Sequence, residues 1–219
     1  GVQPGAPGRD RTGQVRLLEY SMADPRRGDP GVCGGQLEVY VEPILPKPIL
    51  VLVGAGHVGR AVVHLAKWLG FYVVVNDDRA EFCTPETTPG ADEYQPVPVE
   101  ELPRQFRITP WTYLVLATRG SNVDVIGLPA LLDTPAAYIG VIGSRRRWAA
   151  TREALMEAGL PEAALARVRS PIGLELNAET PQEIAVSIMA EIIMLRQGGD
   201  GQVMAGLTSE NVGESGAPA

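Results

Sequence analysis

The sequence predicts an α/β fold of the Rossmann-like, doubly wound type with a mostly parallel sheet, and three observations lead to this prediction. The apolar run 49–53 breaks into the turn GAGHVG, which leads directly into a helical pattern. Strand-like and helix-like segments then alternate along the chain, as they do in parallel sheets with right-handed crossovers. A second apolar run, 71–75, precedes Asp77, which lies 21 residues after Gly56, where dinucleotide-binding folds carry a ribose-binding acid.

Residues 1–47 are expected to form a tail and a partial β-rich domain. Residues 1–13 are rich in glycine, proline and charge, so we expect them to be disordered. Strands are predicted over 14–22 and 36–42, on either side of a turn-rich break. The prolines 43, 46 and 48 predict a stiff linker to the next domain.

Residues 48–197 are predicted to form a nucleotide- or cofactor-binding domain, followed by a disordered tail over 198–219. Apolar runs predict its strands at 49–53, 71–75, 113–117, 137–142 and 167–169. Apolar stripes at helical spacing predict its helices at 58–69, 145–158 and from 181 to about 195. Residues 80–107 are expected to be a loop with a short helix near Glu100. Thr180, Pro181 and Glu183 have the spacing of a capping box, which makes the start of the last helix the clearest helix signal in the chain.

The composition excludes several classes of protein. The net charge of −7 and the pI near 4.9 argue against a general nucleic-acid binder, which needs a broad basic surface. No apolar run approaches the roughly 20 residues that span a bilayer. No signal peptide is recognised, and two cysteines give no disulfide framework, so a cytoplasmic location is predicted.

The candidate binding residues follow four predicted strands. Because the carboxyl ends of parallel strands meet at one edge of the sheet, we expect these residues to line one crevice. Gly54 is expected to allow a tight turn, Gly56 to let a phosphate approach the backbone, and Gly59 to let helix and strand pack closely. The predicted binding residues are Gly54, Gly56, His57, Val58, Gly59, Asp77, Asp78, Arg79, Thr118, Arg119, Gly120, Gly143, Ser144, Arg145 and Arg146.

Plainer interpretations stand beside these assignments. The arginines 145–147 form either an anion site at a helix start capped by Ser144 or a solvated first turn. Asp77 and Asp78 bind a ribose or cap a turn, and Arg79 pairs with one of them or accommodates a 2′-phosphate. Cys33, in the CGG motif, is an accessible thiol or a small buried hydrophobe. No residue is assigned to catalysis or to a metal.

Several motifs together resemble a known family. They are CGG at 33–35, GAGHVG at 54–59, DDR at 77–79, TRG at 118–120, IGSRRR from 142, PIGLELNAETPQEIAVSI from 171 and AEI from 190. In their order and spacing, over about Val32 to Arg196, the chain closely resembles the XdhC/CoxI family of xanthine dehydrogenase accessory proteins. The family's N-terminal region normally extends further before CGG, so the small domain is expected to be incomplete. Ser121 stands where the family often has a histidine.

The resemblance implies a maturation factor. Members of the family bind molybdenum cofactor (molybdopterin or its dinucleotide form), protect it while a cysteine desulfurase supplies its sulfur, and assist its insertion into a molybdenum hydroxylase of the xanthine dehydrogenase or carbon monoxide dehydrogenase type. A homodimer is expected, and Cys33 is expected to contact molybdenum or sulfur. The alternatives are an NAD(P)-dependent oxidoreductase and a nucleotide-sensing regulator, so NAD(P) remains a second candidate ligand.

Overall fold

The computed structural model describes residues 16–21, 36–42 and 44–204. The predicted tail over 1–13, the end of the chain from 205 and the CGG motif with Cys33 lie outside the described residues. The chain divides into two compact units, Gly1–Pro46 and Lys47–Ala219.

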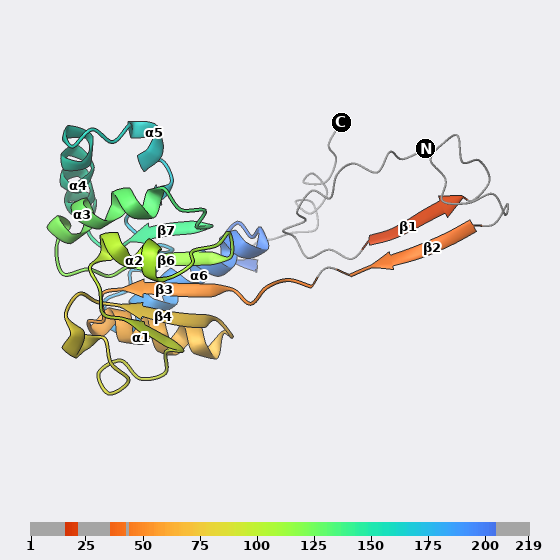
Figure 1. Cartoon of the computed structure of the whole chain (residues 1–219), viewed down its shortest axis with the longest axis horizontal. Helices are drawn as coiled ribbons and strands as arrows, with labels where there is room; N and C mark the ends of the chain where they lie inside the picture. Colours follow the sequence, from red (N-terminus) through yellow and green to blue (C-terminus); the bar gives the residue numbers. More distant parts are fainter. Residues whose placement is uncertain (1–15, 22–35, 43, 205–219) are drawn as a thin grey trace. The chain divides into compact units, whose positions relative to one another are not determined.

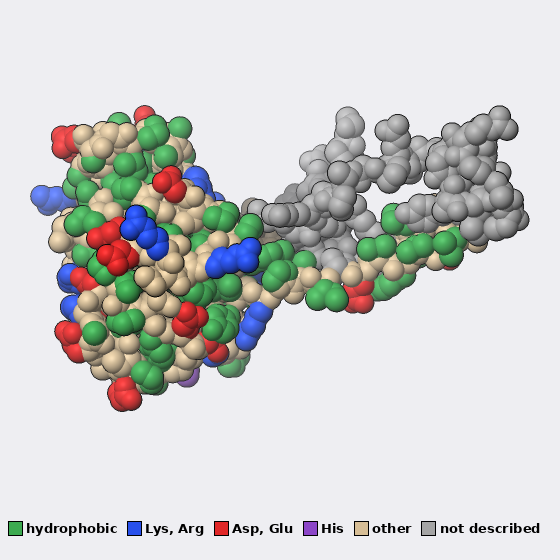
Figure 2. Space-filling model, in the orientation of Figure 1, with side chains coloured by type: hydrophobic (Ala, Val, Ile, Leu, Met, Phe, Trp, Pro, Cys, Tyr) green, Lys and Arg blue, Asp and Glu red, His purple; other side chains and the backbone are tan. Residues whose placement is uncertain are grey.

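In the first unit, β1 (Arg16–Ser21) pairs with β2 (Gln36–Val41) in an antiparallel hairpin, as predicted. Large apolar side chains of this hairpin are exposed, among them Leu17, Leu37 and Tyr40. Figure 2 shows apolar side chains, in green, on the part of the hairpin that is not grey.

The second unit contains a six-stranded parallel sheet in the order β5-β4-β3-β6-β7-β8. Its strands are β3 (Ile49–Val53), β4 (Tyr72–Asn76), β5 (Glu93–Gln95), β6 (Thr112–Leu116), β7 (Tyr138–Val141) and β8 (Val168–Arg169). Strands β3, β6 and β7 lie side by side and point the same way in Figure 1. This arrangement confirms the Rossmann-like fold class. The strand order reverses between β3 and β6, which is where open α/β sheets bind ligands.

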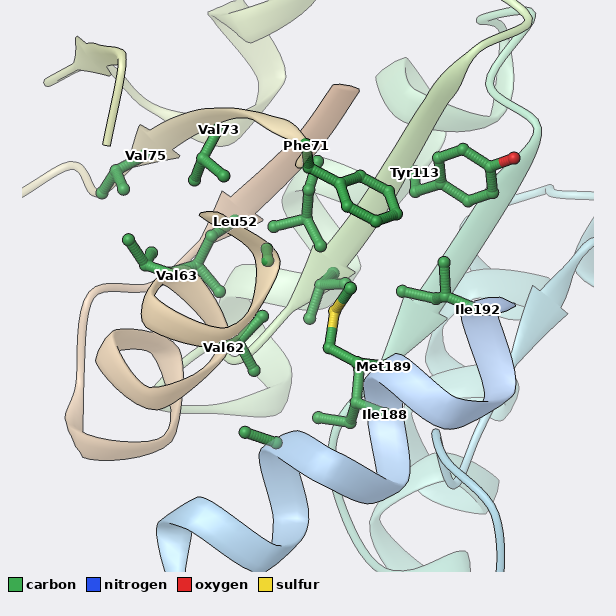
Figure 3. Close-up of a cluster of buried hydrophobic side chains, with 14 of the residues drawn as sticks. Leu52, Val62, Val63, Phe71, Val73, Val75, Tyr113, Ile188, Met189 and Ile192 are labelled. Atoms are coloured by element: carbon green, nitrogen blue, oxygen red, sulfur yellow. The ribbon is translucent and has the colours of Figure 1, made fainter. Parts of the chain in front are cut away.

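Helices cover both faces of the sheet. On one face, α1 (His57–Trp68) and α6 (Pro181–Gln197) enclose a core that includes Leu52, Phe71 and Met189 (Figure 3). On the other face, α3 (Ser121–Leu132) and α4 (Arg145–Glu157) cover a second core. The short helices are η2 (Ala80–Phe82), η3 (Val99–Glu101), α2 (Leu102–Gln105) and α5 (Glu162–Leu165). None of the helices in the described part of the chain is long and apolar enough to cross a bilayer.

The start of α6 confirms the predicted capping box. The Thr180 hydroxyl accepts a hydrogen bond from the Glu183 N–H at 3.2 Å, and a Glu183 carboxylate oxygen accepts one from the Thr180 N–H at 2.9 Å. The N–H groups of Thr180 and Glu179, which both donate to this carboxylate, hold the pKa of Glu183 below its usual value. Because two otherwise unpaired donors are satisfied, α6 begins at a fixed residue.

The sequence did not predict strand β5 or helix α3, nor the short helices η2 and α5. Helix α3 has the sequence SNVDVIGLPALL, with Gly127 and Pro129 inside it, and both residue types disfavour a helix interior. Packing explains the glycine, because a Cβ at Gly127 would lie 2.5 Å from Cγ1 of Val99 on η3. Strand β5 is only three residues long and lies within the segment predicted to be a loop.

Candidate functional site

The glycine turn between β3 and α1 contains three glycines with different structural roles. Gly54 has φ +99°, and a Cβ there would lie 2.5 Å from the carbonyl oxygen of Ala117 at the end of β6. A Cβ at Gly59 would lie 2.3 Å from the Gly54 carbonyl oxygen. A Cβ at Gly56 would meet nothing within 4 Å. Packing therefore requires Gly54 and Gly59, whereas Gly56 leaves the space in front of α1 open.

The first turn of α1 provides neither a side-chain cap nor an acidic residue for the N–H groups at the start of the helix. Gly56 is the N-cap and provides no side-chain cap, and the first turn contains no acidic residue. The first N–H groups of a helix have no partner within the helix, and the helix dipole places partial positive charge there. The backbone at His57 and Val58 is therefore suited to binding a phosphate or another anion.

Asp77, at the predicted ribose position, accepts hydrogen bonds from other groups of this chain. Its carboxylate accepts hydrogen bonds from the Ala55 N–H at 2.9 Å, the Arg79 N–H at 3.1 Å, and Arg79 Nε and Nη2, both at 2.9 Å. A carboxylate offers about four acceptor positions, so this one is saturated. The side chain is 2% exposed. Asp77 thus fixes the glycine turn, and a ribose would have to displace Arg79.

Arg79 is held in place by its contacts with Asp77 and Phe82. Its guanidinium also lies over the Phe82 ring, 4.1 Å from the ring centroid. The hydrogen bond to Asp77 raises the pKa of Arg79. Arg79 therefore pairs with an aspartate, which was the plainer of its two interpretations. A 2′-phosphate would have to compete with Asp77 for the guanidinium.

Asp78 and Arg119 connect the ends of β4 and β6, the two strands that flank β3. Arg119 Nη1 and Nη2 donate to the two Asp78 oxygens at 2.6 and 2.8 Å, and this hydrogen bonding lowers the pKa of Asp78. The two side chains are 35% and 46% exposed. A solvent-exposed ion pair of this kind is worth about 0 to 1 kcal/mol, so it can open at little cost.

Arg147 lies beneath the loop that follows β6. Its Nη2 donates to Asp124 Oδ2 at 2.6 Å and to Thr118 Oγ1 at 2.8 Å, and Asp124 is fully buried. The Thr118 hydroxyl donates to the other Asp124 oxygen at 2.5 Å. Gly143 is part of the same arrangement, because a Cβ there would lie 2.9 Å from Cδ of Arg147.

The three arginines at the start of α4 therefore divide into one structural and two exposed residues. Ser144 caps α4 by accepting from the Arg147 N–H, as expected. Arg145 and Arg146 are exposed, whereas Arg147 turns inward to Asp124. The interpretation of 145–147 as one anion-binding group is thus wrong for Arg147, because its guanidinium forms an ion pair with the buried Asp124.

The structure brings most of the predicted strand ends together, but the crevice between them is narrow. Its cavity is about 10 Å³, room for about one water molecule. The predicted residues that line it are Gly54, Asp77, Asp78, Arg79, Thr118 and Arg119. Gly120 is the N-cap of α3 beside it. Asn76 also lines the cavity; it is fully buried, its Nδ2 donates to the Gln95 and Val97 carbonyls, and its Oδ1 has no partner within the described residues.

His57 lies elsewhere. It lines a groove of about 510 Å³ between α1 and α6, together with Arg60, His64 and residues of the first half of α6. Although His57 lies within the glycine turn, its side chain does not line the β3–β6 crevice.

Comparison with known proteins identifies the family. A family model described as the XdhC Rossmann domain matches residues 50–192. The chain belongs to the XdhC family. The resemblance seen in the sequence is thereby confirmed.

Relatives of this XdhC-family chain include two curated proteins. The chain is 37% identical over 197 residues to the uncharacterized protein YqeB of Escherichia coli (strain K12), a match that covers 86% of this chain and 35% of that protein. It is 35% identical over 159 residues to a protein of Bacillus subtilis (strain 168) described as a probable xanthine dehydrogenase subunit, covering 73% of this chain and 46% of that protein. The chain thus spans less than half the length of both relatives.

One solved structure is also similar. A crystal structure of a xanthine dehydrogenase from Bacillus halodurans matches with a TM-score of 0.62 and 32% sequence identity. The match covers 74% of this chain and 47% of that chain.

The segment that begins at Pro171, one of the motifs that carried the resemblance, is anchored to α6 and β7. Glu191 on α6 is buried and accepts hydrogen bonds from the Tyr138 hydroxyl and the Gly173 N–H, both at 2.7 Å. Burial and the hydrogen bond to Glu191 raise the pKa of Tyr138. Arg169 lies 3.5 Å from the other Glu191 oxygen. A hollow of about 600 Å³ adjoins these groups, but they bind one another, which favours a structural role for the motif.

The cysteines contribute no binding group within the described residues. Cys83 is buried and its thiol donates to the Val75 carbonyl at 3.3 Å, and burial raises the pKa of the thiol. This environment makes Cys83 a packing residue. In the described part of the chain, no group of three or more His, Cys, Asp or Glu side chains could hold a metal ion.

Proposed function

We propose that this chain is an accessory protein that binds molybdenum cofactor and assists its delivery to a molybdenum hydroxylase of the xanthine dehydrogenase type. Family membership supports this, as do the names of the B. subtilis relative and the B. halodurans structure. A cysteine desulfurase partner and the protection of the cofactor during sulfuration belong to the same proposal, through the family resemblance.

The observation that carries the proposal is the uncapped start of α1 behind Gly56. Molybdopterin carries a phosphate, and this helix start offers unpaired N–H groups, no acidic neighbour in its first turn and open space at Gly56. When bound, the cofactor supplies the molybdenum centre that the target enzyme needs. The protein's part is to hold the phosphate with backbone N–H groups of α1, and Arg119 can add a charge-assisted hydrogen bond if it leaves Asp78.

A dinucleotide carrier or oxidoreductase receives less support from the same geometry. A ribose in the usual position would need acceptor capacity on Asp77, which Ala55 and Arg79 already use. The β3–β6 crevice also has room for about one water molecule while Asp78 and Arg119 are paired. A phosphate bound by the backbone N–H groups of α1 requires neither the Asp77–Arg79 pair nor the Asp78–Arg119 pair to open.

The proposal is tested with Gly56→Val. The residue has φ −73° and ψ −169°, which valine adopts readily, and its Cβ points into open space, so the variant is expected to fold normally. Its side chain would occupy the space through which a phosphate reaches the helix start. Molybdenum cofactor released from a purified molybdoenzyme, NADH and NADPH are each titrated into wild type and variant, with binding read from fluorescence and melting temperature.

We expect the wild type to bind molybdenum cofactor and the variant to lose binding at unchanged melting temperature without ligand. Gly56→Ala serves as the graded control and should weaken binding less. Wild-type binding of NADH or NADPH without binding of molybdenum cofactor would contradict the proposal, as would equal cofactor binding by Gly56→Val.

A further inference from the structure

The groove between α1 and α6 has the chemistry of a protein-docking surface. We call it the α1–α6 groove, and it is lined by His57, Arg60, Ala61, His64, Leu65, Pro181, Gln182, Ala185 and Val186. The two helices lie side by side over the sheet (Figure 3). On α1 the lining residues recur every three or four positions over two turns, so the groove follows the helix axis.

The floor of the groove permits close approach by another helix. Ala61 and Ala185 carry no side chain beyond Cβ, and Ala185 is buried at the bottom of the groove. Leu65 is partly buried, and Val186, which is 49% exposed, adds apolar surface. A third helix can lie between two packed helices with its apolar residues in the groove.

One flank of the groove carries hydrogen-bond donors that have no partner among the described residues. No hydrogen bond or ion pair within the described residues engages the side chains of His57, Arg60 or His64. Arg60 is charged at every physiological pH, and each imidazole has an N–H to donate. Helix α1 contains no Asp or Glu, although the whole chain has a net charge of −7. The other flank, on α6, presents Gln182 and Val186, which are uncharged.

Glu183 lies close to the groove on α6, and its carboxylate is held by backbone N–H groups. Glu183, one residue beyond Gln182, accepts the N–H groups of Glu179 and Thr180 in the capping box. The groove therefore combines an apolar floor with a flank on which Arg60 forms no ion pair with any described residue.

We propose that the α1–α6 groove binds an amphipathic α-helix of a partner protein, with apolar residues facing Ala61 and Val186 and acidic residues along the flank that faces Arg60. This goes beyond cofactor binding and does not depend on it. Because His57 is the first residue of α1, a helix docked here would lie beside the helix start that is proposed to hold the phosphate.

The test uses two synthetic peptides of about 18 residues, long enough to form a helix. Both carry leucines at helical spacing on one face; one has glutamates along a single flank, and its twin has lysines there. Binding of each fluorescently labelled peptide to the whole chain is measured by anisotropy, for wild type and for Arg60→Glu, Val186→Glu and Arg104→Glu. Arg104 is an exposed arginine on α2 and serves as the matched control.

We expect the acidic peptide to bind wild type and Arg104→Glu at least about tenfold more tightly than the lysine twin, a difference of about 1.4 kcal/mol. Arg60→Glu should reverse the preference between the two peptides, and Val186→Glu should abolish binding of both. Equal binding of the two peptides, no binding of the acidic one, or unchanged binding by Arg60→Glu would overturn the proposal. So would a wild type that sediments as a dimer beside a monomeric Arg60→Glu, because the occupant would then be a second copy.

Discussion

The two sides of the β3 carboxyl end differ in how their charges are partnered. On the crevice side, Asp77 binds Arg79, Asp78 binds Arg119 and Asp124 binds Arg147. On the outer side of α1, the described residues engage neither Arg60 nor the two histidines. Both regions contain basic residues, and both adjoin the glycine turn that leads into α1. In this protein, the acidic partner of a basic residue therefore decides whether that residue is free to meet a ligand.

The largest effect is expected from Arg147→Ala. Removing this guanidinium leaves the fully buried carboxylate of Asp124 without a counter-charge, which should lower the free energy of unfolding by about 3 to 5 kcal/mol. Arg60→Ala, from the unpaired region, should change it by less than about 0.5 kcal/mol. Urea unfolding of both variants measures the contrast, and equal losses would remove the distinction between the two regions.

Asp77→Ala is expected to have the next largest effect. The buried Ala55 N–H loses its acceptor and Arg79 loses its partner, which should cost about 2 to 3 kcal/mol. Amide hydrogen exchange should also accelerate at Ala55, since Asp77 holds that N–H. If the protein with Asp77→Ala were as stable as wild type, Asp77 would be free to bind a ribose rather than needed to hold the glycine turn.

The smallest effect is expected from Asp78→Asn. The exposed pair with Arg119 should contribute less than about 1 kcal/mol. The folded pKa of Asp78 is lowered, so this contribution is present above the unfolded pKa of about 4 and is lost as the pH falls through the folded value. Wild type and variant should therefore differ slightly in denaturant midpoint at pH 7 and converge in strong acid. A difference that grew on acidification would contradict this interpretation of the pair.

The fold could be predicted from the sequence wherever a local signal agreed with the packing. The run Ile49–Val53 indicated the central strand, and Thr180, Pro181 and Glu183 indicated the start of α6. Helix α3 could not be predicted, because Gly127 is required by contact with Val99, a residue distant in the sequence.

The candidate site was predictable as a location but not in its internal pairing. The rule that ligands lie beyond the carboxyl ends of parallel strands grouped the loops after β3, β4 and β6, which do meet at one crevice, whereas the predicted residues 143–146 after β7 do not line it. Which arginine meets which acid depends on side-chain direction, so the inward turn of Arg147 to Asp124 had no sequence signal beyond the presence of both residues. The groove beside His57 was also not predictable, since it depends on α6 packing against α1.

The most direct test of the central claim, that the start of α1 holds the phosphate, is amide chemical-shift mapping by NMR as molybdenum cofactor is added to the whole protein. We predict the largest shifts at the N–H groups of Gly56, His57 and Val58, and their loss in Gly56→Val. Large shifts confined to loops away from the glycine turn, with those three amides unmoved, would contradict the claim.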